Sequence, residues 1–421
     1  MIKKSLYVFI AYSFLIAFLS REIGGLPYAN LVDLVLVIIW VAVVFKTPQG
    51  HYTVVFNSLF YLFMLWFVIS VLEGFNPGSS VAGWVSEIRS TALYPVLLIP
   101  LAFLIFRNNR DLDVFLILII VLSSLASING IKQLFLGPSQ GEQMFLNEGG
   151  YITHILNGRL RVFSFYSDAG QFGASQAQIG LISFILATGP FSKWKRLVFL
   201  VCAMLMLYGM LISGTRGALF ALIVGAAIAI ILSRNLKVIL VGGLISCSFL
   251  YVLKFTYIGN DNYQIYRLRS AVNPDDPSLL VRLNTQKNLR EYMSSRPFGA
   301  GLGVIGYNGR LHNPDRYLST VPPDSYYVKV WAMYGIVGFT IWFCIMLFVF
   351  GKCCGIVWNI KDEGLRTKLI ALTAGFAGIL FCSYGNEVIN SLPSSFVVYI
   401  SLVFVFIGPK LDIVRKSTLL N

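Results

Sequence analysis

The residues best suited to chemistry are arginines that gather in one polar stretch of the chain. Residues 256–324 lie between two apolar runs and contain seven arginines, namely Arg267, Arg269, Arg282, Arg290, Arg296, Arg310 and Arg316. A guanidinium group can hold two phosphate oxygens through parallel hydrogen bonds. The stretch therefore indicates a site for an anion such as a diphosphate. Solvated loop charge and contacts with lipid headgroups explain any single one of these arginines equally well.

Arg216 is a sharper candidate because it lies in a tight turn, Ser213-Gly214-Thr215-Arg216-Gly217, between two apolar runs. An arginine at the membrane boundary is costly unless it is paired or solvated. The helix that begins at this turn adds free backbone amides and a dipole, and both favour an anion. The alternative is an arginine that extends its side chain to the headgroup region. We favour the anion-binding interpretation.

The elements around these arginines are long apolar runs. Apolar residues make up 57% of the 421 positions and charged residues only 12%, whereas a soluble domain carries roughly a quarter charged residues. We predict an all-α, polytopic membrane protein of about twelve transmembrane helices, because a helix needs about 20 mostly apolar residues to cross the hydrocarbon core. The expected spans are residues 6–22, 28–46, 52–72, 92–106, 112–137, 170–189, 195–212, 216–233, 237–255, 325–350, 367–383 and 394–409.

Lysine and arginine predict the orientation, because cytoplasmic loops are enriched in both. With the N-terminus placed in the cytoplasm, basic runs such as Lys193-Trp194-Lys195-Arg196 fall on the cytoplasmic side. We expect an inner-membrane protein with both termini cytoplasmic and the stretch 256–324 on the outer, periplasmic side. The net charge of +14 then reflects topology, and no nucleic-acid partner is expected because no compact basic domain exists.

This topology divides the chain into three regions. Residues 1–255 are expected to hold spans one to nine with short loops. Residues 256–324 form the large periplasmic loop with catalytic and binding residues, and residues 325–421 hold spans ten to twelve and the cytoplasmic C-terminus.

Four short motifs occur in order along residues 160–340. They are Arg161-Val162-Phe163-Ser164-Phe165 with Asp168; the turn 213–218 with Arg216; Arg282 followed by the glycine-rich stretch 296–303; and Pro323-Asp324-Ser325-Tyr326-Tyr327 with Tyr334-Gly335-Ile336-Val337-Gly338. In order and spacing, these motifs resemble those of the bacterial O-antigen polymerase and O-antigen ligase superfamily. Its members are membrane glycosyltransferases that use lipid-linked sugars, so the resemblance implies a GT-C-like architecture.

The resemblance also implies a reaction. An undecaprenyl-diphosphate-linked oligosaccharide donates its reducing-end sugar to a hydroxyl of a second lipid-linked repeat unit, and undecaprenyl diphosphate leaves. Arginines aimed at the diphosphate would stabilise its growing negative charge. We assign that role first to Arg216 and Arg282, as catalytic and diphosphate-binding residues, and then to Arg161 and Arg290.

The attacking hydroxyl benefits from a positioned base. Asp324 is the first candidate for this base and His312 the second. Tyr326 and Tyr327 could bind sugar rings, or they could pack at the membrane interface, where tyrosine is common. The superfamily's ligases carry a histidine where this chain has Pro323, which favours a repeat-unit polymerase over a ligase.

Other functions remain open at this point: an O-antigen ligase, a flippase or transporter for the lipid-linked glycan, or a scaffold without chemistry. Partners expected for a polymerase are the lipid-linked oligosaccharide, membrane lipids and a polysaccharide chain-length regulator.

No metal or other cofactor is expected. Metal-based lipid-sugar transferases place paired carboxylates in their first outer loop, and here residues 20–27 contain Glu22 alone. Asp275-Asp276 lies between two prolines without a third ligand nearby, which indicates a turn. Residues 301–306 match G-x-G-x-x-G but lack the strand–turn–helix context of a dinucleotide site.

Overall fold

The computed structural model describes residues 2–156, 158–258, 260–261, 263–271, 273 and 277–420. The described chain is helical apart from loops and one short antiparallel pair of strands. The Asp275-Asp276 pair, expected to form a turn, lies outside the described residues.

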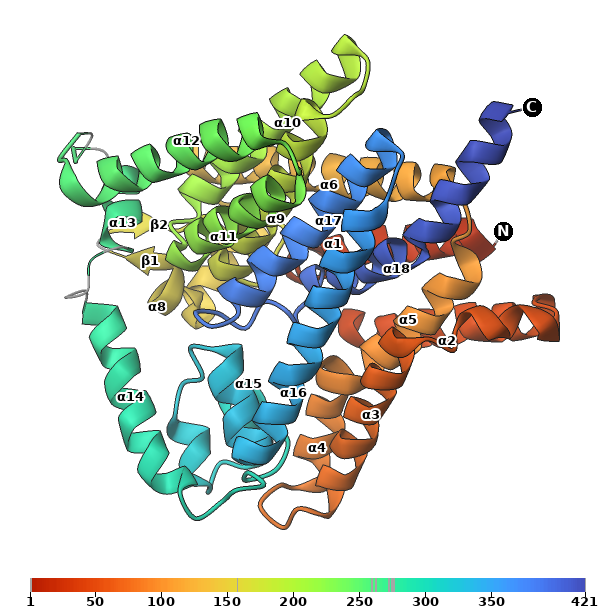
Figure 1. Ribbon diagram of the computed structural model, residues 1–421. Coiled ribbons are helices and arrows are strands. Elements are labelled where there is room, and N and C mark those ends of the chain that lie inside the picture. The colour runs from red at the N-terminus through yellow and green to blue at the C-terminus, as the bar shows by residue number, and fades with distance from the viewer. Residues whose placement is uncertain are drawn as a thin grey trace.

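Long helices form the body of the molecule (Figure 1). They are α1 (Ile2–Glu22), α2 (Tyr28–Lys46), α3 (Ser58–Leu72), α5 (Tyr94–Ile105), α6 (Asn109–Phe135), α9 (Ala169–Thr188), α10 (Lys193–Ile212), α11 (Arg216–Leu232), α12 (Leu236–Phe255), α14 (Pro277–Met293), α16 (Tyr326–Asn359), α17 (Glu363–Cys382) and α18 (Ser394–Leu420).

Shorter elements connect them. They are α4 (Val81–Ile88), α7 (Gln140–Phe145), α8 (Tyr151–His154), β1 (Ile155–Leu156), β2 (Arg159–Leu160), α13 (Tyr263–Ser270) and α15 (Gly306–His312), with the π-helical turns η3 (Arg89–Leu93) and η4 (Leu146–Gly150) and the 3-10 turns η1 (Gln49–Val54), η2 (Glu73–Phe75) and η5 (Tyr317–Thr320).

Among the described residues, ten helices are long and apolar enough to cross a membrane. The multi-pass membrane character is therefore confirmed, while the predicted count of twelve is not. All twelve expected spans coincide with helices, but two fall short of the length or hydropathy of a span. One is α11, an apolar helix of 17 residues. The other is α9, which is rich in small and polar residues and is buried among α10, α11 and α17, a composition suited to packing between helices.

The helix around Pro95 begins earlier than predicted. It was expected from residue 92, but α4, η3 and α5 form one helical segment from Val81 to Ile105. Ser80 caps its start by accepting a hydrogen bond from the amide of Gly83. The wide π turn lies directly before Pro95, whose missing N–H breaks the regular helical ladder. This extension places Glu87 inside the protein.

Within residues 256–324, α15 packs against α4 and α14 contacts α16, whereas α13 packs against α10, α11 and α12. In Figure 1, α14 and α15 lie away from both termini. The glycine-rich stretch in this range forms a close backbone contact with α16. Gly299 and Gly335 both have positive φ, and a Cβ on either would lie 2.0–2.1 Å from a carbonyl oxygen of the other segment. The amide of Gly301 donates to the Met333 carbonyl at 3.0 Å. We call this contact the glycine clasp.

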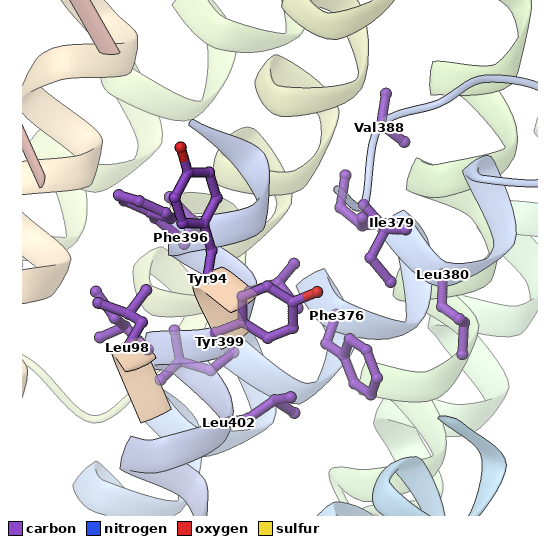
Figure 2. Close-up of a cluster of buried hydrophobic side chains, with 14 of the residues drawn as sticks. Tyr94, Leu98, Phe376, Ile379, Leu380, Val388, Phe396, Tyr399 and Leu402 are labelled. Carbon is purple, nitrogen blue, oxygen red and sulfur yellow. The ribbon is translucent and has the colours of Figure 1, made fainter. Parts of the chain in front are cut away.

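An apolar cluster packs α5, α17 and α18 together. Figure 2 shows Tyr94 and Phe396 on one side of this cluster and Val388 and Ile379 on the other, with the Tyr94 hydroxyl pointing away from Leu98. The Tyr94 and Phe396 rings meet edge to face at 5.8 Å. Val388 belongs to the loop between α17 and α18, so the cluster holds that loop in place.

Candidate functional site

Three consecutive residues form the turn that precedes Arg216. Ser213 ends α10, Gly214 adopts a φ of +58° that favours glycine, and Thr215 precedes the first turn of α11. Arg216 is then the first helical residue of α11 and is partly exposed. Thr215 is buried, and its hydroxyl donates to the Ala169 carbonyl at 2.8 Å.

Two further arginines converge on this turn. Arg161 donates to the Thr215 hydroxyl at 3.3 Å, and Arg267 donates through Nε to the Gly214 carbonyl at 3.0 Å. Burial, together with the nearby charges of Arg267 and Arg216, lowers the pKa of Arg161 to about 10, although Asp168 opposes the shift. Arg161, Arg216 and Arg267 are called the arginine cluster below.

Two helices begin at the arginine cluster. Asp168 caps α9 by accepting a hydrogen bond from the Gln171 amide at 2.9 Å, and α11 begins at Arg216. A Cβ on Gly173 would lie 2.3 Å from the Ser213 hydroxyl, so the two helix starts are in close contact. The start of α11 has no side-chain cap among the described residues, so its amides and helix dipole add positive potential to that of the guanidinium groups.

Arg282 lies next to the loop that connects α17 to α18. One of its terminal nitrogens would be 3.7 Å from a Cβ on Gly385. In the same loop, the Asn386 amide nitrogen would lie 2.7 Å from a Cβ on Gly217, the residue after Arg216. Gly385 and Asn386 are neighbours in this loop. Arg282 therefore lies beside one of them, and the turn that carries Arg216 lies beside the other. Arg282 also pairs with Asp324 at 3.9 Å, and both side chains are more than a third exposed.

Two of the predicted site residues lie elsewhere. Arg290 is exposed on α14, about 12 Å along the helix axis from Arg282 at 1.5 Å per residue. His312 ends α15, and its Nε2 lies 3.0 Å from the Ser86 hydroxyl on α4. The structure does not join either side chain to the arginines above.

The two tyrosines predicted to contact sugar make packing contacts. Tyr326 is 2% exposed, and its ring meets Trp342 edge to face at 5.4 Å. The Tyr327 hydroxyl donates to the Leu380 carbonyl at 2.9 Å, and its ring lies against Trp342 and Phe343. This arrangement favours the packing role that the sequence left open for both residues.

The sequence did not indicate a charged triad that the structure places beside this region. Lys329 on α16 lies 2.9 Å from Glu87 of α4 and 2.9 Å from Glu387 in the α17–α18 loop. Asn308 of α15 donates to the second Glu87 oxygen at 2.8 Å. The three charged residues lie far apart in the sequence, so their only sequence signal was the presence of charge beside apolar runs.

Fold and site together define a multi-pass membrane protein with a cluster of guanidinium groups at the meeting point of two helix starts. Residues 201–343 match the family described as O-antigen ligase. A protein of Salmonella muenchen described as O-antigen polymerase is 25% identical over 264 residues, which cover 60% of this chain and 64% of that protein. Less than two thirds of that relative is therefore matched.

These comparisons support the resemblance that the motifs predicted: residues 201–343 are similar to the O-antigen ligase family, and the chain is similar to a protein described as O-antigen polymerase. The matched range includes Arg216, Arg267 and Arg282, whereas Arg161 and Glu387 lie outside it.

Proposed function

We propose that this protein is a glycosyltransferase that joins undecaprenyl-diphosphate-linked oligosaccharide repeat units into O-antigen or a related surface polysaccharide. The reaction would take place on the periplasmic face of the inner membrane, with both termini in the cytoplasm. The proposal rests on the family match together with one structural observation. Three arginines from separate parts of the chain converge where α11 begins: Arg161 donates to the Thr215 hydroxyl, Arg267 donates to the Gly214 carbonyl, and Arg216 is the first residue of the helix.

A bound polyanion would balance the positive charge of these arginines. Like charges disfavour one another when they are partly buried, and an anion among them restores the favourable balance. A diphosphate carries two phosphate groups, so it offers enough oxygens for several guanidinium groups at once. In the transition state, the bond between the anomeric carbon and the phosphate oxygen breaks and the diphosphate gains charge. The arginine cluster and Arg282 are fixed before the reaction and would stabilise that charge.

The acceptor hydroxyl must lose its proton as it attacks. Of the two candidates from the sequence, Asp324 is nearer the proposed diphosphate site because it pairs with Arg282. His312 is held against Ser86 instead. This chemistry uses arginine, rather than a metal, to balance the charge of the leaving group.

A polymerase is favoured over a ligase by the relative's description and by Pro323, which stands where ligases of the superfamily carry a histidine. The two activities differ in the acceptor: a second lipid-linked unit for the polymerase and a lipid A core for the ligase. The polymerase would work beside a chain-length regulator.

The test is a glycan ladder from a strain in which this gene is deleted and then complemented. Lipopolysaccharide capped with a single repeat unit in the deletion, restored to a ladder on complementation, supports the polymerase. Long polymer that accumulates on the lipid carrier, without transfer to the core, identifies a ligase. Lipid-linked units trapped inside the cell identify a flippase and contradict the proposal.

The ladder also tests the arginines. Arg216→Ala and Arg282→Ala are each expected to abolish the ladder while the protein remains in the membrane. Arg290→Ala serves as the comparison, because Arg290 lies apart from the other two. A normal ladder in both Arg216→Ala and Arg282→Ala would contradict the diphosphate site.

A further inference from the structure

The charged triad Glu87–Lys329–Glu387 lines a cavity of about 320 Å³. Ligand pockets range from about 300 to 1,000 Å³, so this one suits a small ligand. Its walls come from α1, the α4–α5 segment, the loop before α9, α15, α16 and the α17–α18 loop. Polar groups on these walls include Ser90, Tyr94, Asn308 and Asn390.

The polar groups of this cavity are not all satisfied by the protein. Asn390 is 6% exposed, and its side-chain oxygen has no hydrogen-bond partner in the described part of the chain. A buried polar oxygen without a partner is costly, so such groups are rare. A ligand with hydroxyl groups that enters the cavity would supply the missing donor.

The two carboxylates of the triad differ in accessibility. The Glu87 side chain is fully buried and receives hydrogen bonds from Asn308 and Thr91, whereas 30% of the Glu387 side chain is exposed. In the described part of the chain, Lys329 alone donates to the Glu387 carboxylate. A single ammonium group therefore faces two carboxylates, which leaves one negative charge that a proton could neutralise.

The cavity and the arginine cluster share one loop. Glu387 follows directly after Asn386, which lies close to Gly217 beside Arg216. Gln171, in the first turn of α9, donates to the Glu387 carbonyl at 2.7 Å. A ligand in the cavity would therefore lie next to a diphosphate held by the arginines.

We propose that this cavity binds the acceptor sugar and that Glu387, in place of Asp324, is its catalytic base. The inference rests on the proposed function. The Glu387 carboxylate takes the proton of the attacking hydroxyl as its oxygen bonds to the anomeric carbon. The bond from that carbon to the phosphate oxygen breaks, and its electron pair leaves with the diphosphate at the arginine cluster. Lys329 is a positioning residue that holds Glu387 toward the cavity.

The test uses the full chain, purified and reconstituted in liposomes, with lipid-linked repeat units isolated from a strain that lacks it. Glu387→Gln is expected to lower the polymerisation rate about 100-fold or more, because a positioned base typically contributes that much. Glu387→Asp should retain a measurable part of the rate. Glu363→Gln, at an exposed carboxylate on α17, is the matched control and should leave the rate unchanged.

A thermal-shift measurement of diphosphate binding separates a failure of this proposal from a failure of the proposed function. Farnesyl diphosphate carries the diphosphate and an isoprenoid chain but no sugar. It should raise the Tm of Glu387→Gln as much as that of the wild type, because the arginines are intact. A wild-type rate in Glu387→Gln overturns the assignment of the base. A wild-type chain that forms no polymer overturns the proposed function, and this inference with it.

Removal of one partner from a buried ion pair can destabilise a protein, so a second variant tests the cavity independently. Asn390→Leu removes the oxygen that lacks a partner and keeps a similar side-chain volume. We expect it to raise the KM for the acceptor about 10-fold with little change in kcat, since a lost hydrogen bond costs about 1–2 kcal/mol. An unchanged KM would overturn the sugar site, even if Glu387→Gln fails to fold.

The pH profile adds a readout that a structural role would not produce. Burial raises the pKa of Glu387, whereas Lys329 lowers it and Glu87 and Asp168 raise it. A base must be ionised, so the rate should fall as the pH drops through this raised pKa. The midpoint of this fall in the plot of rate against pH should shift in Glu387→Asp and should be unchanged in Glu363→Gln. An unchanged midpoint in Glu387→Asp contradicts the assignment.

Discussion

At the scale of single residues, Arg161 illustrates how the site differs from ordinary surface charge. Its guanidinium group is largely buried beside two other arginines, and its pKa is lowered to about 10. The group still carries its charge at pH 7, so several positive charges lie close together at this turn. Such an arrangement is expected where a site is organised in advance for an anion.

A thermal-shift measurement tests this interpretation. Farnesyl diphosphate should raise the Tm of the wild-type chain, because a ligand that binds the folded state alone stabilises it. Arg216→Lys should reduce the shift and lose most of the polymerising activity, since an ammonium group cannot replace the two-pronged geometry of a guanidinium group. A full shift in Tm and full activity in Arg216→Lys would show that a positive charge at this position suffices and that the guanidinium geometry is not required.

Residue types and motifs predicted part of this site. Arg161, Arg216 and Arg282 were all named from the sequence, and the structure places each beside the meeting point of α9, α11 and the α17–α18 loop. Arg267 was named only as one of seven loop arginines. The sequence analysis did not identify Glu387, because its partners Glu87 and Lys329 come from distant parts of the chain. No local sequence pattern predicts such a contact.

At the scale of elements, the apolar runs predicted the helices well. Two helices differ from the predictions, and both contain polar residues. The span predicted from residue 92 omitted residues 81–91, which are helical, and Glu87 within them is buried in an ion pair with Lys329. Residues 170–189 were predicted as a span despite their small and polar residues; α9 packs inside the bundle as expected of such a composition, but its hydropathy is below that of a candidate span.

The glycine clasp explains two of the sequence motifs as structure rather than chemistry. The stretch 296–303 contacts the backbone of α16 at Gly335, where no Cβ could fit. Residues 301–306, which match a dinucleotide-binding pattern, therefore overlap a stretch whose glycines allow close backbone packing against α16. The clasp fixes α16, which carries Lys329 toward the cavity, so it positions the site indirectly.

Gly299→Ala tests the clasp. Alanine at a φ of +89°, with its Cβ about 2.1 Å from the Met333 carbonyl oxygen, should cost at least about 2 kcal/mol, because strained backbone alone costs about 1–3 kcal/mol. The Tm of the purified protein in detergent should fall accordingly. Gly351→Ala is the control on α16, because a Cβ there meets nothing within 4 Å. Equal Tm values for the two variants would argue against the clasp.

At the scale of the whole molecule, the central question is orientation. The positive charge of the short connections predicts that segment 256–324 faces the periplasm, and this segment carries Arg267 and Arg282 beside the proposed site. In the structure its helices α13, α14 and α15 lie away from both termini (Figure 1). An arrangement with the termini on one face and the site on the other is what the proposed topology requires.

Cysteine labelling tests this orientation. Phe298 is 65% exposed, whereas its neighbour Ala300 is 8% exposed, so Phe298→Cys is the better probe. It should react with a membrane-impermeant thiol reagent in intact spheroplasts. Trp194→Cys, at an exposed position in the first turn of α10, should react only after the membrane is opened. The parent chain with its six cysteines measures the background, and the reverse pattern would overturn the topology.

The most direct test of the proposed function is a reconstituted reaction with the purified chain alone. Liposomes that contain this protein and undecaprenyl-diphosphate-linked repeat units should produce lipid-linked glycan of two or more units. One undecaprenyl diphosphate should be released for each bond formed, and Arg216→Ala should produce neither. Repeat units that stay unjoined with the wild-type chain, or that join equally well with Arg216→Ala, would contradict the account.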